Sequence, residues 1–155
     1  MISIQTDNEI QEQENFGAIH FHALEIAAAA TLMHIRPEQE SDIGITLANE
    51  AQLQQLNSQF LGIDSPTDVL AFPDGDIDPD SQRVYLGDII ISIPRAASQA
   101  ESGGHSLTAE LQLLIVHGVL HLLGCDHARF EDKEAMWKIQ GEILASISCE
   151  ITQPV

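Results

Sequence analysis

Residues 111–123 constrain the fold of this chain more than any other stretch of its sequence. They are apolar on nearly every side of a helix, so this helix is expected at the centre of a domain. Ser106 suits the cap at the start of the helix, and Gly124 suits the position just after its end. Residues 111–125 form a run of 15 without a formal charge, but two histidines interrupt it, which makes it too short and too polar to span a membrane.

The rest of the sequence predicts strands and helices that alternate around this central helix. Apolar–polar alternation predicts strands, and apolar residues at helical spacing predict helices. The expected strands are 1–5, 42–48, 68–72 and 84–93, with a polar turn over 73–82, and the expected helices are 15–35, 49–60, 94–102, 106–123 and 131–148. No repeat or linker divides the 155 residues. We therefore expect a single α+β domain over residues 1–155, with a small mixed β-sheet packed against helices.

The charge of the chain limits the partners that it can bind. Six Lys and Arg against 24 Asp and Glu give a formal net charge of −18, and the isoelectric point is near 4.3. Such a surface repels nucleic acid and anionic lipid at long range, so a nucleic-acid substrate requires a local basic patch, a metal ion or a docking partner. The first 15 residues lack the basic and apolar regions of a secretory signal, and Cys125 and Cys149 are too few for a disulfide scaffold. We therefore expect a soluble protein of the reducing cytoplasm.

Three histidines in the segment HGVLHLLGCDH form the strongest chemical signal in the sequence. His117 and His121 share one face of the predicted helix, and Gly124 lets the chain turn so that His127 can return to that face. Three imidazoles around one ion, with water in the fourth position, are typical of an open zinc site, although nickel or copper also suits three nitrogen ligands. The alternative is a set of core histidines paired with carbonyl oxygens, but unpaired imidazoles in so apolar a helix are costly, which favours the metal. The spacing equals that of the metzincin proteases, except that Gly118 replaces their glutamate base.

Several other polar residues have two interpretations each. Asp126 either orients an imidazole or caps the exit of the helix. Cys125 is either a small buried residue or a further thiolate ligand. Asp68 either lines a cleft or caps a turn. Arg129 and Lys133 share one face of the predicted last helix, where they either meet phosphate or form part of a solvated surface.

Stretches in a fixed order carry a resemblance to a known family. They are LNSQFLGIDSPTDVLAFP at residues 56–73, LGDIIIS at 86–92, ELQLLIVHGVLHLLGCDH at 110–127 and, after these, Met136. Over about residues 56–142 the chain resembles the YbeY family of bacterial metal-dependent endoribonucleases, the rRNA maturation factors. The pattern HGxLHLxGxDH is highly specific to that family. The resemblance implies an α+β fold whose central helix carries the first two metal ligands.

The resemblance also implies a zinc-dependent hydrolase that cuts phosphodiester bonds in single-stranded RNA. It implies a cytoplasmic role in 3′-end maturation of small-subunit rRNA and in ribosome quality control. The expected partners are rRNA, the small subunit and ribosome-associated proteins, and neither DNA nor a membrane. One Zn²⁺ per chain, or Ni²⁺ in its place, would be held by His117, His121 and His127. Asp88, which matches a family position, or Asp126 would orient the attacking water, and the alternative for Asp88 is a strand-end carboxylate in a turn or cap.

The chain departs from the family at Leu61. The family has an arginine there, which the resemblance assigns to RNA phosphate, and a leucine cannot replace a guanidinium that makes two hydrogen bonds to phosphate. This departure and the charge of −18 keep a second hypothesis open, a non-catalytic ribosome-associated factor with a structural metal. A zinc metallopeptidase is a third hypothesis, supported by the ligand spacing and weakened by Gly118.

Overall fold

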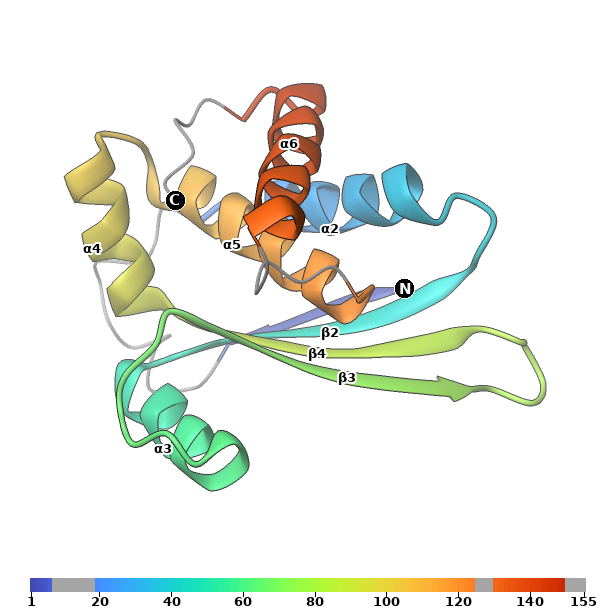
Figure 1. The fold of residues 1–155 in the computed structure, drawn as a ribbon, viewed down its shortest axis with the longest axis horizontal. Coiled ribbons are helices and arrows are strands. Elements are labelled where there is room, and N and C mark those ends of the chain that lie inside the picture. Colours follow the sequence, from blue (N-terminus) through green and yellow to red (C-terminus); the bar gives the residue numbers. More distant parts are fainter. Residues whose placement is uncertain (7–18, 125–129, 150–155) are drawn as a thin grey trace.

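The computed structural model describes residues 1–6, 19–124 and 130–149, with residues 130–132 described by their backbone alone. The strands are β1 (Ile2–Thr6), β2 (Ser41–Ala48), β3 (Val69–Ile77) and β4 (Val84–Ser92), and the helices are α2 (Phe21–Ile35), α3 (Glu50–Leu61), α4 (Ile93–Gly103), α5 (Leu107–Leu122) and α6 (Phe130–Ser146). The strands form one sheet in the order β1-β2-β4-β3, in which β1, β2 and β4 run parallel and β3 runs antiparallel to β4. Helices α2, α4, α5 and α6 lie on one side of the sheet, and α3 lies on the other (Figure 1).

Helix α5 is the centre of the domain because nearly all of its side chains are apolar and need burial. Ser106 begins the helix by accepting a hydrogen bond from the backbone N–H of Ala109 at 3.0 Å. Ile115 and Leu120 have no exposed surface. The helix contacts α2, α4, α6, β3 and β4, so it joins the other helices of its layer to the sheet. Hydrophobic burial around α5 therefore holds both layers together.

The caps of α3 and α4 fix where these helices start. The side chain of Asn49 accepts from the N–H of Gln52 at 2.8 Å, and the side chain of Gln52 accepts from the N–H of Asn49 at 3.0 Å. Strand β4 turns directly into α4, where the hydroxyl of Ser92 accepts from the N–H of Arg95 at 3.3 Å. Helix α4 ends at Gly104 with a φ of 73°, a conformation that suits glycine. The chain then enters α5, so α4 lies beside the first turns of the central helix (Figure 1).

An extra residue in β4 changes which side chains point to which face of the sheet. In the pairing of β2 with β4, Leu86 is the additional residue of a β-bulge between Tyr85 and Gly87. Gly87 has a φ of 140°, and a side-chain carbon placed on it would collide with the carbonyl oxygen of Phe72, so only glycine fits there. Because the bulge shifts the alternation by one, Tyr85 and Asp88 lie on the same face of the sheet.

The mixed sheet and the central helix confirm the predicted fold class, and one predicted element is wrong. The polar turn expected over residues 73–82 is too long, since β3 continues to Ile77 and pairs with β4 as far as Val84. The actual turn begins at Asp78, whose carboxylate accepts from the N–H of Asp80 at 2.8 Å. The first helix begins at Phe21, and residues 15–18 of its expected range lie outside the described residues. Within the described parts of the chain, no helix has the length and apolar character needed to cross a membrane.

Candidate metal centre and adjoining cavity

His117 and His121 lie one turn apart near the C-terminal end of α5, and their rings converge. Their Nε2 atoms are 3.0 Å apart, and their ring centroids are 4.5 Å apart. Both side chains are half-buried, whereas most of the helix around them is buried. The spacing of four residues, which predicted a shared face, therefore brings two nitrogen donors to one point at the surface of the core.

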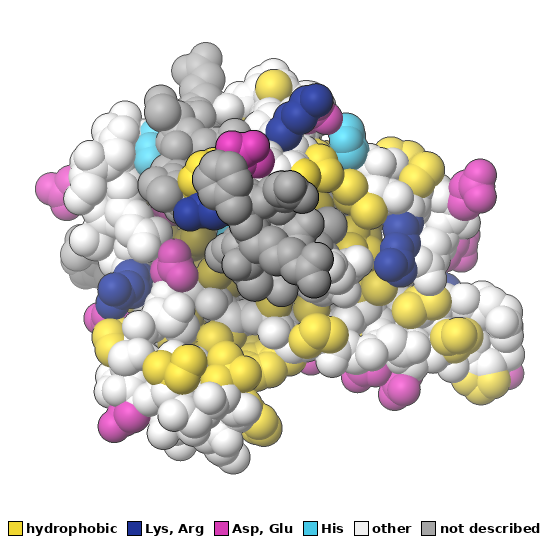
Figure 2. All heavy atoms as spheres, in the orientation of Figure 1, with side chains coloured by type: hydrophobic (Ala, Val, Ile, Leu, Met, Phe, Trp, Pro, Cys, Tyr) yellow, Lys and Arg dark blue, Asp and Glu magenta, His cyan; other side chains and the backbone are white. Residues whose placement is uncertain are grey.

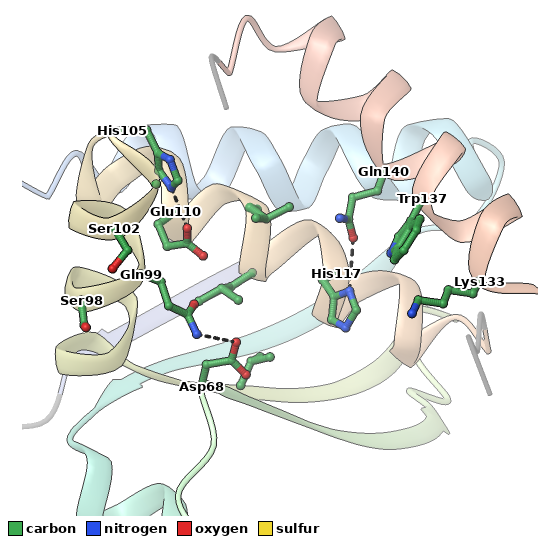
Figure 3. Close-up of a pocket in the computed structure, with 14 residues that line it drawn as sticks. Asp68, Ser98, Gln99, Ser102, His105, Glu110, His117, Lys133, Trp137 and Gln140 are labelled. Atoms are coloured by element: carbon green, nitrogen blue, oxygen red, sulfur yellow. Dashed lines mark hydrogen bonds and ion pairs between the residues drawn. The ribbon is translucent and has the colours of Figure 1, made fainter. Parts of the chain in front are cut away.

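A buried glutamine fixes the orientation of the His117 ring. Gln140 on α6 is 3% exposed, and its Oε1 lies 3.2 Å from Nδ1 of His117 (Figure 3). An amide oxygen can only accept, so Nδ1 donates, and the lone pair of a neutral imidazole then lies on Nε2. Partners of this kind hold metal-binding histidines in place in other proteins. Sequence reasoning missed Gln140, although a glutamine one turn after Met136 in an apolar stripe was a signal that it is buried and bonded.

The geometry of the two described histidines fits a metal ion such as zinc. Two nitrogen ligands at about 2.0–2.1 Å from a tetrahedral ion are about 3.3 Å apart, close to the 3.0 Å between the two Nε2 atoms. The described residues contain no group of three His, Cys, Asp or Glu side chains that could hold a metal. The third predicted ligand, His127, and the predicted carboxylate Asp126 lie outside the described residues, as do Cys125 and Arg129. The complete three-histidine site therefore stays a prediction.

The structure does not bring Asp88 together with the histidines. Ile89, the next residue of β4, faces Gly118 of α5, and successive side chains of a strand point to opposite faces. Asp88 accordingly lies on the face of the sheet away from α5, where it is exposed and accepts a hydrogen bond from the Tyr85 hydroxyl at 2.5 Å. Burial and then this carboxylate raise the pKa of Tyr85 to about 12. The expected role of Asp88 in orienting water has no support in its position.

Gly118 has no room for a side chain. A side-chain carbon placed there would lie 3.0 Å from Cγ2 and 3.1 Å from Cδ1 of Ile89, which is itself fully buried. The position therefore points at Ile89 of the sheet, although its backbone also lines a hollow together with His117 and His121. A glutamate base at this place in the sequence, as in the metzincin proteases, would be driven into the core, which is evidence against the metallopeptidase hypothesis.

A cavity of about 620 Å³ opens beside His117 (Figure 3). One face of α5 forms its floor, on which Glu110, Leu113, Leu114 and His117 follow one another at helical spacing. The cavity therefore begins at a candidate metal ligand and runs back along the same helix for about 10 Å, the length of seven residues of helix. This volume is within the range of small-molecule sites, about 300–1,000 Å³.

The walls of the cavity come from α4 and α6, which flank α5. Helix α4 contributes Ser98, Gln99 and Ser102, and α6 contributes Lys133 and Trp137. The Nζ atom of Lys133 lies 4.7 Å from the centre of the Trp137 ring, within the range of a cation–π contact. In Figure 3 these two side chains lie at the His117 end, and the α4 residues lie at the other. Lys133, one of the two residues of the predicted basic face, thus lies at the cavity.

Two bonded pairs occupy the end of the cavity away from His117. Oε1 of Glu110, whose side chain is 3% exposed, lies 2.6 Å from Nε2 of His105. The amide of Gln99 donates to the carboxylate of Asp68 at 3.3 Å. Of the two sequence interpretations of Asp68, the structure supports the cleft. The pair of His105 and Glu110 was missed, because no ligand spacing marked either residue.

A second hollow, of about 290 Å³, also involves His117. It is lined by both candidate metal ligands, by residues of β3 and by Leu61 at the end of α3. Leu61 is 55% exposed and belongs to an apolar patch with Phe60 and Ile63, which are 60% and 51% exposed. Figure 2 shows apolar side chains gathered over α3. Leu61, where the resemblance implies an arginine, therefore lies beside the histidines.

Known proteins match nearly the whole chain. The family model described as Endoribonuclease YbeY matches residues 2–148. An Endoribonuclease YbeY of Brevibacillus brevis is 38% identical over 161 residues, which cover 95% of this chain and 98% of the relative. Another from Chloroflexus aurantiacus is 41% identical over 145 residues, 90% of this chain and 93% of the relative. The solution structure of a Thermotoga maritima protein is 27% identical, covers 95% of this chain and 89% of that chain, and superposes with a TM-score of 0.60.

Proposed function

The chain belongs to the Endoribonuclease YbeY family, and we propose that it is a metal-dependent endoribonuclease that cuts single-stranded RNA. Its function is the maturation of rRNA, at the 3′ end of the small-subunit rRNA, by hydrolysis of a phosphodiester bond. It acts in the cytoplasm with the small ribosomal subunit and ribosome-associated proteins as partners, and it contributes to ribosome quality control. Family membership over nearly the whole chain supports this proposal.

In this proposal His117, His121 and His127 hold one Zn²⁺, or Ni²⁺ in its place. When bound, such an ion lowers the pKa of a coordinated water and polarises a phosphate oxygen. Gln140 keeps the His117 proton on Nδ1, so that Nε2 is available as a ligand. Asp126 would then accept a hydrogen bond from the attacking water and orient it.

The residues around His117 bind and orient the RNA. His117 lines both the cavity and the hollow, so a single strand that occupies both would place one phosphate at the histidines. Lys133 places a positive charge at that point, which a chain of net charge −18 needs in order to attract phosphate. The RNA is unstacked there, because a protein reaches a phosphate and its bases in a single strand far more easily than in a duplex.

The observation that carries the proposal is the convergence of two imidazole nitrogens, 3.0 Å apart, of which the His117 ring lines both the cavity and the hollow. Metal analysis of the purified protein should find about one equivalent of zinc or a similar ion. A single-stranded RNA should be cut, and a chelator should abolish cutting until zinc is added back.

The variant His121→Ala should lose the metal, since two imidazoles are a poor site for an ion that prefers three protein ligands and water. His34→Ala is the matched control, because His34 lies on α2 beside Glu142, at 3.5 Å, and lines neither the cavity nor the hollow. A metal content that is the same in His121→Ala and in the parent would contradict the site.

The position of Leu61 favours a second candidate, a non-catalytic ribosome-associated factor that keeps the metal for structure. An apolar side chain lies where the family uses a phosphate-binding arginine, so the grip on RNA is weaker at this hollow. Co-sedimentation with small subunits, without cutting of RNA by the metal-loaded protein, would favour this candidate over the nuclease.

A further inference from the structure

The cavity beside His117 has two chemically different ends. At the His117 end it has a cation, Lys133, and the aromatic ring of Trp137. At the other end it has the carboxylates of Asp68 and Glu110. Figure 3 shows this separation along α5. A ligand that fits must therefore be anionic at one end and offer hydrogen-bond donors at the other.

The middle of the cavity is apolar. Leu113 and Leu114 form the floor between the two ends, and Val69 lines it as well. Two of these residues, Leu113 and Leu114, are buried and belong to the main core, so the surface is held rigidly. The ligand therefore has a central part that prefers contact with hydrocarbon.

A ribonucleotide has all three of these properties. Its phosphate is anionic, its base is flat and largely apolar on its faces, and its ribose hydroxyls are hydrogen-bond donors. Acidic side chains are the usual acceptors of ribose hydroxyls in nucleotide sites, and the 2′-hydroxyl distinguishes RNA from DNA. An acyl chain would bring no hydrogen-bond donor to this end, where the carboxylates of Asp68 and Glu110 already bond to Gln99 and His105 but can each accept further bonds.

Building on the proposed function, we infer that the cavity binds the ribonucleoside next to the cleaved phosphate. Lys133 contacts that phosphate, the base lies over Leu113 and Leu114, and Asp68 accepts a hydrogen bond from the 2′-hydroxyl. The amide of Gln99, which donates to the Asp68 carboxylate at 3.3 Å, holds this acceptor in place. The cavity is then the part of the site that selects RNA.

Binding can be measured without any cleavage. Trp137 is the sole tryptophan of the chain and lines the cavity, so its fluorescence reports what enters. The probes are the 3′- and 5′-monophosphates of the four ribonucleosides, their 2′-deoxy counterparts and the free nucleosides. Equilibrium dialysis of the same compounds provides a second readout. Saturable binding is expected for the ribonucleotides, about tenfold tighter than for the deoxynucleotides, because one charge-assisted hydrogen bond is lost in the latter.

Two variants test the two ends of the cavity, each with a matched control. Asp68→Asn should remove the preference for ribose, whereas Asp64→Asn should keep it, since Asp64 also accepts from a glutamine amide but lies outside the cavity. Lys133→Gln should weaken the binding of nucleotides about tenfold and leave the binding of free nucleosides unchanged. Lys138→Gln removes the same charge from an exposed position of α6 and should have no effect on either.

The results separate this inference from the proposed function. If dialysis shows no saturable binding of any ribonucleotide, or if Asp68→Asn and Asp64→Asn keep the same ribose preference, the inference is overturned even when RNA is cut. If ribonucleotides bind with the expected preferences but RNA is not cut, the cavity assignment holds and the nuclease proposal fails.

Discussion

The two faces of the sheet share strand β4 but provide very different surroundings for polar groups. On the α5 side Ile89 is fully buried, and two buried polar side chains are bonded: Gln140 to His117, and Glu110 to His105 at the other end of the cavity. On the α3 side Asp88 is exposed and bonds to Tyr85. Two adjacent residues of β4 thus face opposite sides of the sheet, one buried under α5 and one exposed to solvent (Figure 1).

This difference shows where the chemistry of the domain can lie. A charge or hydrogen bond is stronger where water is excluded, so groups on the covered side can bind an ion or orient a phosphate effectively. A carboxylate on the open face is solvated and bonded to a tyrosine, and its influence on the other side of the sheet is weak. The four predictions below test this division between the faces.

The largest effect is expected from a substitution that forces a charged side chain between α5 and the sheet. Gly118→Glu would force a carboxylate against Ile89, where even a first side-chain carbon would lie 3.0 Å from Cγ2. Overpacking together with a buried charge should destabilise the protein by about 4 kcal/mol or more. Urea denaturation measures the change. Gly118→Ala requires Ile89 to move by only a few tenths of an ångström and gains about 1 kcal/mol in helix propensity, so its effect on stability should be far smaller.

Gln59→Glu on the exposed surface of α3 adds the same charge on the other side of the sheet and should change stability by less than about 0.5 kcal/mol. Equal urea midpoints for Gly118→Glu and this control would show that the space between α5 and the sheet can hold a charged side chain, which would contradict the packing of Gly118 against Ile89.

The next effect concerns the support of a metal ligand on the covered side. Gln140→Leu removes the acceptor of the His117 Nδ1 proton and should weaken zinc binding about 10–100-fold. Competition with a chelating dye measures this affinity. Gln112→Leu is the control, because Gln112 is also buried and its amide donates to the carbonyl of Ala23 at 2.9 Å. If both variants lose the same zinc affinity, the effect reflects general destabilisation and not the orientation of His117.

The third prediction concerns the edge where the two faces meet. Leu61→Arg introduces a guanidinium into the hollow beside the histidines and should strengthen binding to single-stranded RNA about tenfold at low salt. The salt dependence of binding should steepen by about one unit of slope, because one further phosphate is contacted. Ile63→Arg adds the same charge to the same apolar patch, outside the hollow, and should change affinity less. Should the two arginine variants bind RNA equally across a salt titration, Leu61 does not face the substrate.

The smallest functional effect is expected on the open face. Asp88→Asn should leave RNA cutting within about twofold of the parent, because Asp88 points away from α5. The same variant should lower the pKa of Tyr85 from about 12, although not to its ordinary value near 10, since burial is the larger cause. Tyr85 is the sole tyrosine of the chain, so its ultraviolet absorption titrates it directly. A loss of cutting above about tenfold would place Asp88 in the reacting centre after all.

The titration also has a consequence for stability. In the parent the raised pKa of Tyr85 contributes stability that is fully present below about pH 10 and is lost as the pH rises toward 12. In Asp88→Asn this loss should be smaller, so the difference in unfolding free energy between the two proteins should be constant from neutral pH to about pH 10 and should change as the pH rises from there toward 12.

Local geometry explains what the sequence predicted well. Helix spacing alone places His117 and His121 on one face, and the uniform apolar character of α5 requires a central position. The Ser106 cap at the start of α5 is likewise decided by a few neighbouring residues. Such features depend on contacts within one or two turns, and the sequence contains all the information needed for them.

Long-range packing explains what the sequence did not predict. The bond from His117 to Gln140 joins residues 23 positions apart, and it exists only because α6 packs across α5. Alternation along β4 shows that the side chains of Asp88 and Ile89 face opposite ways, but only the packing of α5 decides which face of the sheet is covered. The bulge at Leu86 also shifts the alternation of the residues that precede it in β4. The acidic end of β3, which reads as a turn, is a strand because β4 pairs with it up to Ile77.

Strand β3 is an edge of the sheet, and no strand of the described chain pairs with its outer side. Such an edge invites the same strand of a second molecule to add to it. Pro73 lacks an N–H, and Asp74 and Asp76 carry charge at exposed positions, so the edge is a poor template at neutral pH. Near the isoelectric point of 4.3 the net charge of the chain approaches zero, so the molecules repel one another less and strand-to-strand association should reduce solubility. The acidity that makes RNA harder to attract is therefore also what keeps the molecules apart.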